Sequence, residues 1–178
     1  MESTVFIDVD TQYSFMHKKG KFYVANSEKI VPNLRRITKF ADERSIPVIA
    51  TIDMHKEHEI ELEVLDSSNN CLEIIKGSKK IKETVSENNV ILEKSQHNPF
   101  SNTELDELIR GKKNAFVFGV ATEFCIQATV LELLKRNIKT YVIEDAIMHV
   151  SQENGKKSIN LMRETGAKFI TTDMLLNS

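Results

Sequence analysis

The chain has 178 residues, with 24 basic and 26 acidic side chains and a formal net charge of -2. A chain of this length can bury roughly 70% of the surface that it exposes when unfolded, so one globular core needs no disulfides or structural metal. The balanced charge gives no reason to expect a nucleic-acid partner, and no apolar run is long enough to cross a membrane. We expect one domain over residues 1–178, located in the cytoplasm.

Short β-branched apolar segments alternate with segments of helical periodicity along the chain. Residues 5–9 predict the first strand, and residues 27–41 predict the first helix with Ser27 as its N-cap. A second strand is predicted over residues 48–51. The charged stretch over residues 53–89 has no clear period, so we expect it to form a long excursion.

The second half of the chain continues the alternation. Its predicted strands cover residues 90–93, 115–120, 140–144 and 168–171. The helices between them are expected to begin at Thr103, Thr122 and Ser151. This order predicts the α/β class, with a doubly wound, mostly parallel sheet of about six strands and helices on both faces, a Rossmann-like three-layer arrangement.

Reactive side chains stand at the ends of four predicted strands. In chain order they are Asp8, Asp10, Asp53, His55, Lys94 and Cys125. Asp8 and Asp10 occupy alternate positions, which places them on one side of an extended strand. Because ligands of doubly wound sheets bind beyond the carboxyl ends of the strands, we expect these groups to meet at one edge.

Their chemistry predicts nucleophilic catalysis. Cys125 falls in the first turn of a helix, and a helix N-terminus and a neighbouring cation such as Lys94 both favour the thiolate. Asp10 can accept the thiol proton and later deliver it to a leaving amine. Backbone N–H groups in the turn before Cys125 are expected to face the developing oxyanion, and Gly119 keeps that turn tight.

Three segments, in chain order, resemble the motifs of the nicotinamidase and isochorismatase-like family of cysteine hydrolases. Residues 10–15 look like its Asp-x-Gln-x-x-Phe motif, residues 94–105 resemble its Lys-led segment, and residues 119–129 are similar to its cysteine signature. The resemblance implies a catalytic triad of Asp10, Lys94 and Cys125. It also implies a cis peptide between Val120 and Ala121, an oxyanion hole formed by the N–H groups of Ala121 and Cys125, and a substrate pocket lined by Gln12, Phe15 and Phe124.

Nicotinamidases of this family bind a divalent metal ion through an Asp-x-His pair after the second strand. Asp53 and His55 match this pair, and the third ligand would be His58 or Glu61. The ion would be zinc, iron or manganese. Asn70 replaces the family's distal histidine, and asparagine is a poor ligand for zinc or iron, so the matched pair and the lost histidine point in opposite directions.

The resemblance implies a homo-oligomeric hydrolase that cleaves a small carboxamide through a Cys125 thioester. The best substrate candidate is nicotinamide, which would give nicotinate and ammonia. An isochorismatase-type or other small-amide hydrolase without metal is the first alternative. His97 is a further candidate for lining the site because it lies close to Lys94 in the chain.

Two other classes of function compete with this interpretation. Residues 5–10 also fit the opening of haloacid-dehalogenase-like phosphatases, with Asp8 as nucleophile and Asp10 as acid, but that interpretation leaves the cysteine segment unexplained. A binding module that has lost turnover is disfavoured because all three triad residues are present. In the hydrolase interpretation, Asp8 supports Lys94 or serves as a turn acid.

Overall fold

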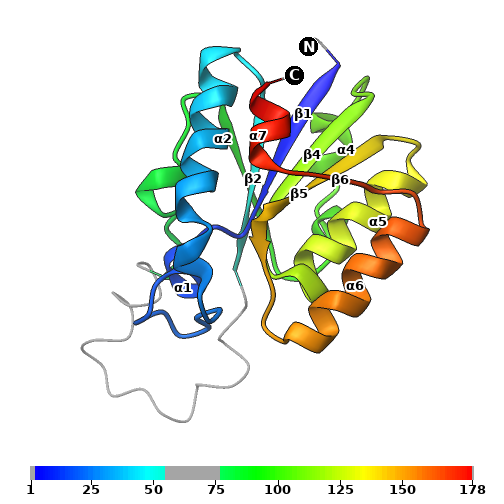
Figure 1. Ribbon diagram of the computed structural model, residues 1–178. Helices are drawn as coiled ribbons and strands as arrows, with labels where there is room; N and C mark the ends of the chain where they lie inside the picture. The colour runs from blue at the N-terminus through cyan, green and yellow to red at the C-terminus, as the bar shows by residue number, and fades with distance from the viewer. Residues whose placement is uncertain (1–2, 55–76, 178) are drawn as a thin grey trace.

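The structure, a computed structural model, describes residues 3–54 and 77–177. Across these residues, six strands form one parallel sheet in the order β3-β2-β1-β4-β5-β6 (Figure 1). The strands are β1 (Thr4–Val9), β2 (Val48–Asp53), β3 (Asn89–Lys94), β4 (Asn114–Val120), β5 (Lys139–Met148) and β6 (Lys168–Ile170). The chain winds outward from β1 in both directions, so the predicted doubly wound sheet is confirmed.

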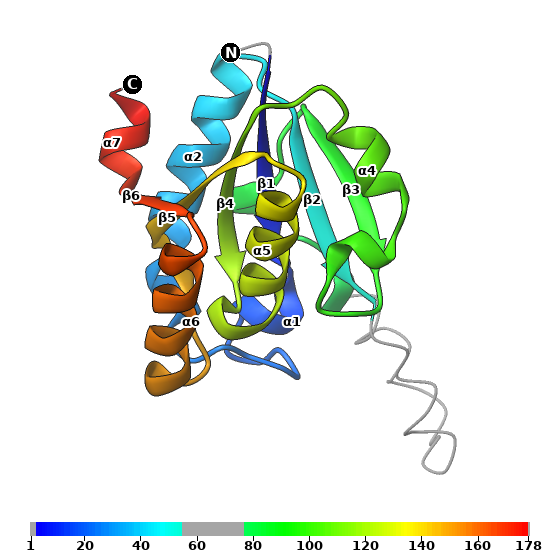
Figure 2. The ribbon, with the colours of Figure 1, turned by 90° about the vertical axis from the view of Figure 1, so that its right-hand side faces the viewer.

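Helices cover both faces of this sheet (Figures 1 and 2). They are α1 (Tyr13–Met16), α2 (Val31–Glu43), α4 (Glu104–Leu108), α5 (Gln127–Lys135), α6 (Gln152–Glu164) and α7 (Thr172–Leu176). The first face packs against α2 and α7, and the second packs against α4, α5 and α6. Within the described ranges, none of these helices is long and apolar enough to span a membrane.

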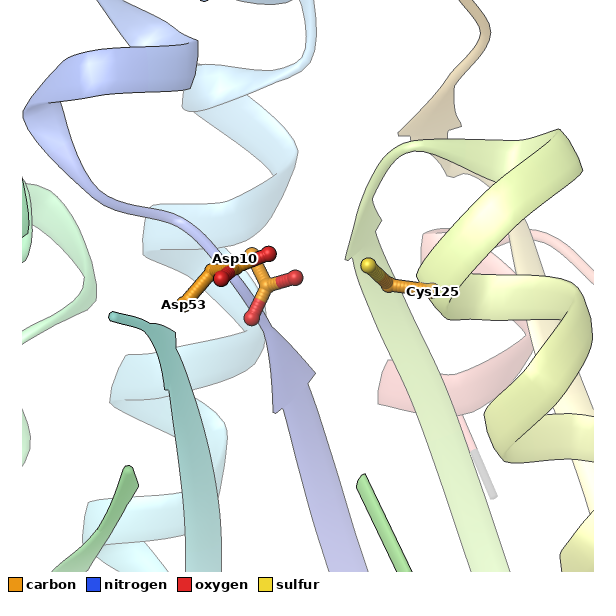
Figure 3. Close-up of side chains that lie close together, drawn as sticks. All are labelled: Asp10, Asp53 and Cys125. Atoms are coloured by element: carbon orange, nitrogen blue, oxygen red, sulfur yellow. The ribbon is translucent and has the colours of Figure 1, made fainter. Parts of the chain in front are cut away.

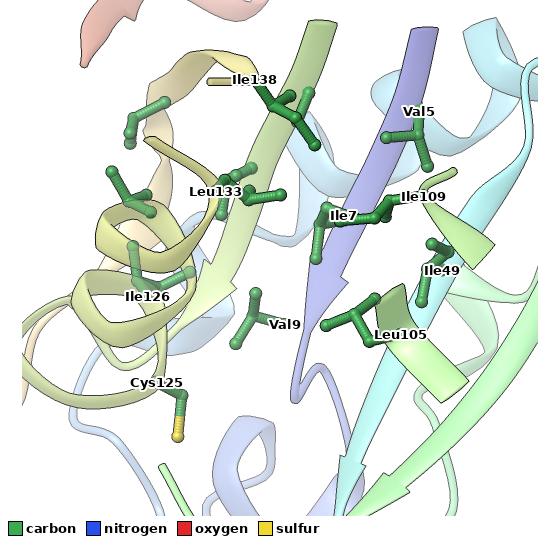
Figure 4. Packing of buried hydrophobic residues seen from close by; sticks show 14 of the residues in the cluster. Val5, Ile7, Val9, Ile49, Leu105, Ile109, Cys125, Ile126, Leu133 and Ile138 are labelled. Carbon is green, nitrogen blue, oxygen red and sulfur yellow. The ribbon is translucent and has the colours of Figure 1, made fainter. Parts of the chain in front are cut away.

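The central strand β1 contributes to the hydrophobic core on both faces. Val5, Ile7 and Val9 pack into the cluster on the side of α4 and α5 (Figure 4). Phe6 points to the other face and packs with the buried side chains of α2. Because both faces are covered, four of the six residues of β1 are apolar, including the unbroken run over residues 5–7.

Of the predicted helix starts, Thr103 and Ser151 stand at the N-caps of α4 and α6 as expected, whereas α2 and α5 begin later, at Val31 and Gln127. Ser151 is confirmed as an N-cap, since its Oγ accepts the N–H of Asn154 at 3.4 Å. No side-chain capping bond is present at the other three predicted caps, Ser27, Thr103 and Thr122. Ser27 lies in a short 3₁₀ turn, and α2 begins only at Val31. Hydroxyl residues also favour turns, so their position before an apolar stripe did not fix the helix start.

Asp8 is the one charged residue within β1, and it is fully buried. Its carboxylate forms an ion pair with Lys80, whose ammonium also donates to the Thr11 hydroxyl at 3.0 Å. Burial raises the pKa of Asp8 above its ordinary value, although Lys80 opposes this shift. Asp8 therefore pairs with Lys80 and not with Lys94, and it ties β1 to the segment that precedes β3.

We expect Lys80→Met to lower the free energy of unfolding by about 3 kcal/mol, because removing one partner leaves a buried charge uncompensated. Chemical denaturation measures this loss. Burial holds the folded-state pKa of Asp8 above the unfolded value, so the deficit should shrink as pH falls through the folded pKa and Asp8 takes up a proton.

The matched control for this variant is Lys157→Met, which breaks an exposed ion pair with Glu153. Its free energy of unfolding should change by less than about 1 kcal/mol. Equal effects of the two substitutions would show that the Asp8–Lys80 pair contributes no more than a surface pair. The double variant Asp8→Asn/Lys80→Met should recover part of the loss because it removes both charges.

Candidate active site

Four polar side chains meet at the carboxyl edge of the sheet, each supplied by a different strand end. Asp10 follows β1, Asp53 ends β2, Lys94 ends β3, and Cys125 lies in the turn Thr122–Ile126 after β4. The Lys94 ammonium lies 2.8 Å from the Asp10 carboxylate, 3.3 Å from the Asp53 carboxylate and 3.4 Å from the Cys125 sulfur. Figure 3 shows the sulfur pointing toward the two carboxylates.

Asp10 is held in place from several sides. Its backbone is left-handed, with φ of 51°, so the strand alternation that predicted a shared side with Asp8 ends before it. The Thr51 hydroxyl donates to Oδ1 of Asp10 at 2.6 Å and accepts the Asp10 N–H at 3.2 Å. The contact of Thr51 with Asp10 was not predicted, although a hydroxyl near the carboxyl end of β2 was a usable signal.

The side chain of Gln12, a predicted substrate contact, forms hydrogen bonds with the backbone of β2. Its Oε1 accepts the Asp53 N–H at 2.8 Å, and its Nε2 donates to the Asp53 carbonyl at 3.1 Å and to the Gly77 carbonyl at 3.3 Å. The side chain thus continues the hydrogen bonding between β1 and β2 beyond the end of β1. We assign it to positioning Asp53, a role that the motif alone did not reveal.

The turn after β4 places the cysteine at the sheet edge. The Val120–Ala121 peptide is cis, and Gly119 before it has φ of 119°. A Cβ at Gly119 would lie 2.1 Å from the Val9 carbonyl oxygen, so no other residue fits between β1 and β4 there. The following turn is π-helical and wider than the regular helix predicted from Thr122. The oxyanion role of the Ala121 and Cys125 N–H groups stays a prediction.

The electrostatics of the resting site differ from the prediction. Burial raises the pKa of the Cys125 thiol, the Asp10 charge raises it further, and Lys94 offsets only part of this. Burial alone would lower the pKa of Lys94, but the charges of Asp10, Cys125 and Asp53 outweigh it and raise the value. The carboxylates of Asp10 and Asp53 already face the single ammonium of Lys94. A Cys125 thiolate would add a third negative charge, which is unfavourable. Burial and the Asp10 charge therefore outweigh the lowering of the thiol pKa that was expected from the helix N-terminus and Lys94.

Aromatic side chains lie on the outer side of Cys125. His97, on the loop after β3, has its Nδ1 3.6 Å from the Cys125 sulfur, and its ring centroid lies 5.2 Å from that of Phe124. Phe124 is 43% exposed and directly precedes Cys125 in the chain. Phe15 packs against Phe22 and the cluster on the side of α2. The substrate roles of Phe15 and Phe124 remain predictions.

The described part of the chain does not by itself form a metal site. Potential ligand atoms of Asp10, Asp53 and Cys125 lie within 4.8 Å of one another. Lys94 stands within hydrogen-bond distance of all three, and a divalent ion among them would face this ammonium at close range. These three residues therefore do not fit a resident metal. Of the predicted ligands, Asp53 lies at the site, and His55, His58 and Glu61 lie outside the described residues.

A doubly wound sheet that carries aspartate, lysine and cysteine at its carboxyl edge defines the class of α/β cysteine hydrolases that the motifs resemble. The chain belongs to the isochorismatase family, since a sequence model described as "Isochorismatase domain" matches residues 4–174. The phosphatase alternative is therefore wrong. Its hydrolases include enzymes that act on amide bonds, such as an N-carbamoylsarcosine amidase.

Known relatives cover nearly the whole chain. A protein of Arabidopsis thaliana described as a "probable inactive nicotinamidase" is 26% identical over 95% of this chain and 92% of its own length. The crystal structure of the pyrazinamidase of Pyrococcus horikoshii in complex with zinc is 26% identical, with a TM-score of 0.82 over 95% of this chain and 99% of that chain. N-carbamoylsarcosine amidase of Thermoplasma acidophilum shares the fold, with 24% identity and a TM-score of 0.78 over 96% and 97% of the two chains.

Proposed function

We propose that the protein is a cysteine amidohydrolase that cleaves a small carboxamide, with nicotinamide as the best substrate candidate. The observation that carries this proposal is the contact of one buried ammonium, that of Lys94, with both the Asp10 carboxylate and the Cys125 sulfur. A base, a cation and a nucleophile are thereby in mutual reach before substrate binds. The likeness to a pyrazinamidase supports a ring carboxamide as substrate.

The geometry supports a two-step reaction. Asp10 accepts the thiol proton as the Cys125 sulfur attacks the amide carbon, and Lys94 stabilises the negative charge on the sulfur. Asp10 then delivers this proton to the leaving nitrogen, the C–N bond breaks, and ammonia departs from a thioester. In the second step Asp10 takes a proton from water, the resulting hydroxide attacks the thioester, and the released thiolate regains a proton. The products are a carboxylic acid and the original thiol.

We also propose a divalent metal ion, with zinc, iron or manganese as candidates. Asp53 and His55 would hold it together with His58 or Glu61, and the ion would orient a ring nitrogen of the substrate. Support comes from the carboxylate of Asp53 at the site and from the zinc complex of the pyrazinamidase. A metal-free isochorismatase-type or other small-amide hydrolase is the alternative, because Asn70 replaces the distal histidine.

Elemental analysis of protein purified without chelator tests the metal assignment. We expect a stoichiometric divalent ion in the wild type and its loss in His55→Ala, because three protein ligands are needed for a useful site. Equal metal content in both proteins, or none in the wild type, would contradict the assignment and favour the metal-free alternative.

An ammonia-release screen tests the catalytic proposal. The substrates are nicotinamide, pyrazinamide and N-carbamoyl compounds, each with and without added divalent ions, and hydrolysis of the isochorismate vinyl ether is followed in parallel. We expect ammonia from at least one amide in the wild type and none from Cys125→Ala. A folded wild type without activity on any of them would point to a chain that has lost turnover, as the name of the Arabidopsis relative states for that protein. Homo-oligomerisation, a cytoplasmic location and a single domain over residues 1–178 stay predictions.

A further inference from the structure

The sulfur of Cys125 has polar neighbours on two sides. On the inner side it faces Lys94 and Asp10, whose side chains are fully buried, with Asp53 behind them. On the outer side it faces Nδ1 of His97 at 3.6 Å, within the range of a hydrogen bond to sulfur. His97 is exposed, so the two sides differ in their access to solvent. The triad accounts for the inner contacts alone.

The loop that carries His97 is anchored on both sides. Lys94 precedes it in the buried core of the site, and Pro99 and Phe100 follow it as buried residues. The side chain of Asn98 accepts the Phe100 N–H at 2.9 Å and so fixes the turn after His97. The imidazole also packs against Phe124, the residue before the cysteine. The loop contacts fix the backbone on both sides of His97, and its ring lies between Phe124 and the sulfur of Cys125.

We propose that His97 is a further catalytic residue, whose Nδ1–H donates a hydrogen bond to the Cys125 sulfur as negative charge develops there. The proposal rests on the proposed function, because it takes Cys125 as the nucleophile. The thiol proton still moves to Asp10, and His97 keeps its own proton throughout. The charge on the sulfur is then shared by the donors from Lys94 and His97.

The chemistry explains why such a donor favours the reaction. A hydrogen bond to an anionic sulfur is stronger than one to a neutral thiol, so His97 stabilises the attacking sulfur more than the resting one. Only an interaction that strengthens toward the transition state raises the rate of the chemical step. The same donor stabilises the thiolate that leaves when the thioester is hydrolysed.

Two variants of similar size separate hydrogen bonding from shape. His97→Asn keeps an N–H donor at the position of Nδ1, and His97→Leu removes it. The measurement is the rate constant for alkylation of Cys125 by iodoacetamide at one pH, with the labelled peptide identified by mass to distinguish it from that of Cys71. We expect His97→Leu to react roughly tenfold more slowly than the wild type and His97→Asn to stay within about threefold of it.

The outcomes distinguish this proposal from the proposed function because alkylation needs no substrate. A rate for His97→Leu within twofold of the wild type, or above it, would overturn the role of His97, and so would His97→Asn reacting as slowly as His97→Leu. The expected rates without hydrolysis of any amide would support the hydrogen bond from His97 to the Cys125 sulfur but contradict the proposed function, and with it the catalytic use of that bond. Thermal unfolding of both variants should match the wild type, because the side chain is exposed.

Discussion

Replacing Cys125 with alanine should reduce kcat for the best amide substrate by at least about 10⁴-fold, because it removes the sulfur that forms the covalent intermediate. Lys94 and Asp10 remain, but neither is placed to attack the amide carbon in the proposed reaction. The measurement is ammonia release under substrate saturation. The side chain is 5% exposed and small, so the denaturation curve should change little.

Cys71→Ala is the matched control for the alanine variant. Cys71 lies outside the described residues and has no assigned role, so its replacement should leave kcat near the wild-type value. Wild-type turnover by Cys125→Ala would refute the thioester mechanism. Loss of activity in both variants would instead show that the assay reports a general effect of removing thiols.

Replacing Asp10 with asparagine should move two measured rates in opposite directions. kcat should fall by at least about a hundredfold, because the general base is lost while the shape of the side chain is kept. Alkylation of Cys125 should become faster, because the Asp10 charge raises the pKa of the thiol and asparagine is neutral. At a given pH below that pKa, the thiolate fraction therefore increases. Iodoacetamide labelling and ammonia release measure the two rates on the same preparation.

Two further variants serve as a comparison and a control for Asp10→Asn. Lys94→Met should slow both alkylation and turnover, because the cation that lowers the thiol pKa is removed. Asp173→Asn, which removes an exposed carboxylate paired with Arg36, should change neither rate. A decrease of both rates in Asp10→Asn would show that the carboxylate stabilises the thiolate, contrary to the electrostatics of the resting site.

The positions of the strands along the chain are predictable from the sequence because buried parallel strands are nearly continuous apolar runs. The segment over residues 5–9 has this pattern, and the structure places β1 at the centre of the sheet. The helix starts could not be read in the same way. Ser27 and Thr122 each stand where a capping hydroxyl is expected, but the chain forms a 3₁₀ turn at the first and a π-helical turn at the second. The local sequence offers several turns of similar energy, and tertiary packing selects among them.

Side chains that meet at strand ends were predictable, but their partners were not. The motif positions of Asp10, Lys94 and Cys125 point to one edge, which the structure shows. The contact of Asp10 with Thr51 depends on the register that places Val9 opposite Thr51, and one sequence does not reveal a register. The bond from Gln12 to the backbone of Asp53 depends on the same register. Burial also reversed the expected direction of the thiol pKa, because a count of neighbouring charges leaves out desolvation.

The assembly of the site from four strand ends ties its chemistry to the folding of the whole sheet. Lys94 is separated by 41 positions from Asp53 and by 31 from Cys125, so none of these contacts forms within a local segment. Bringing these residues together requires the closure of long loops, so the site depends on the long-range pairing of the strands. A fragment of the chain that lacks β4 therefore cannot place Cys125 beside Lys94. In a denaturant titration, turnover should disappear together with the far-UV signal of the sheet and not before it.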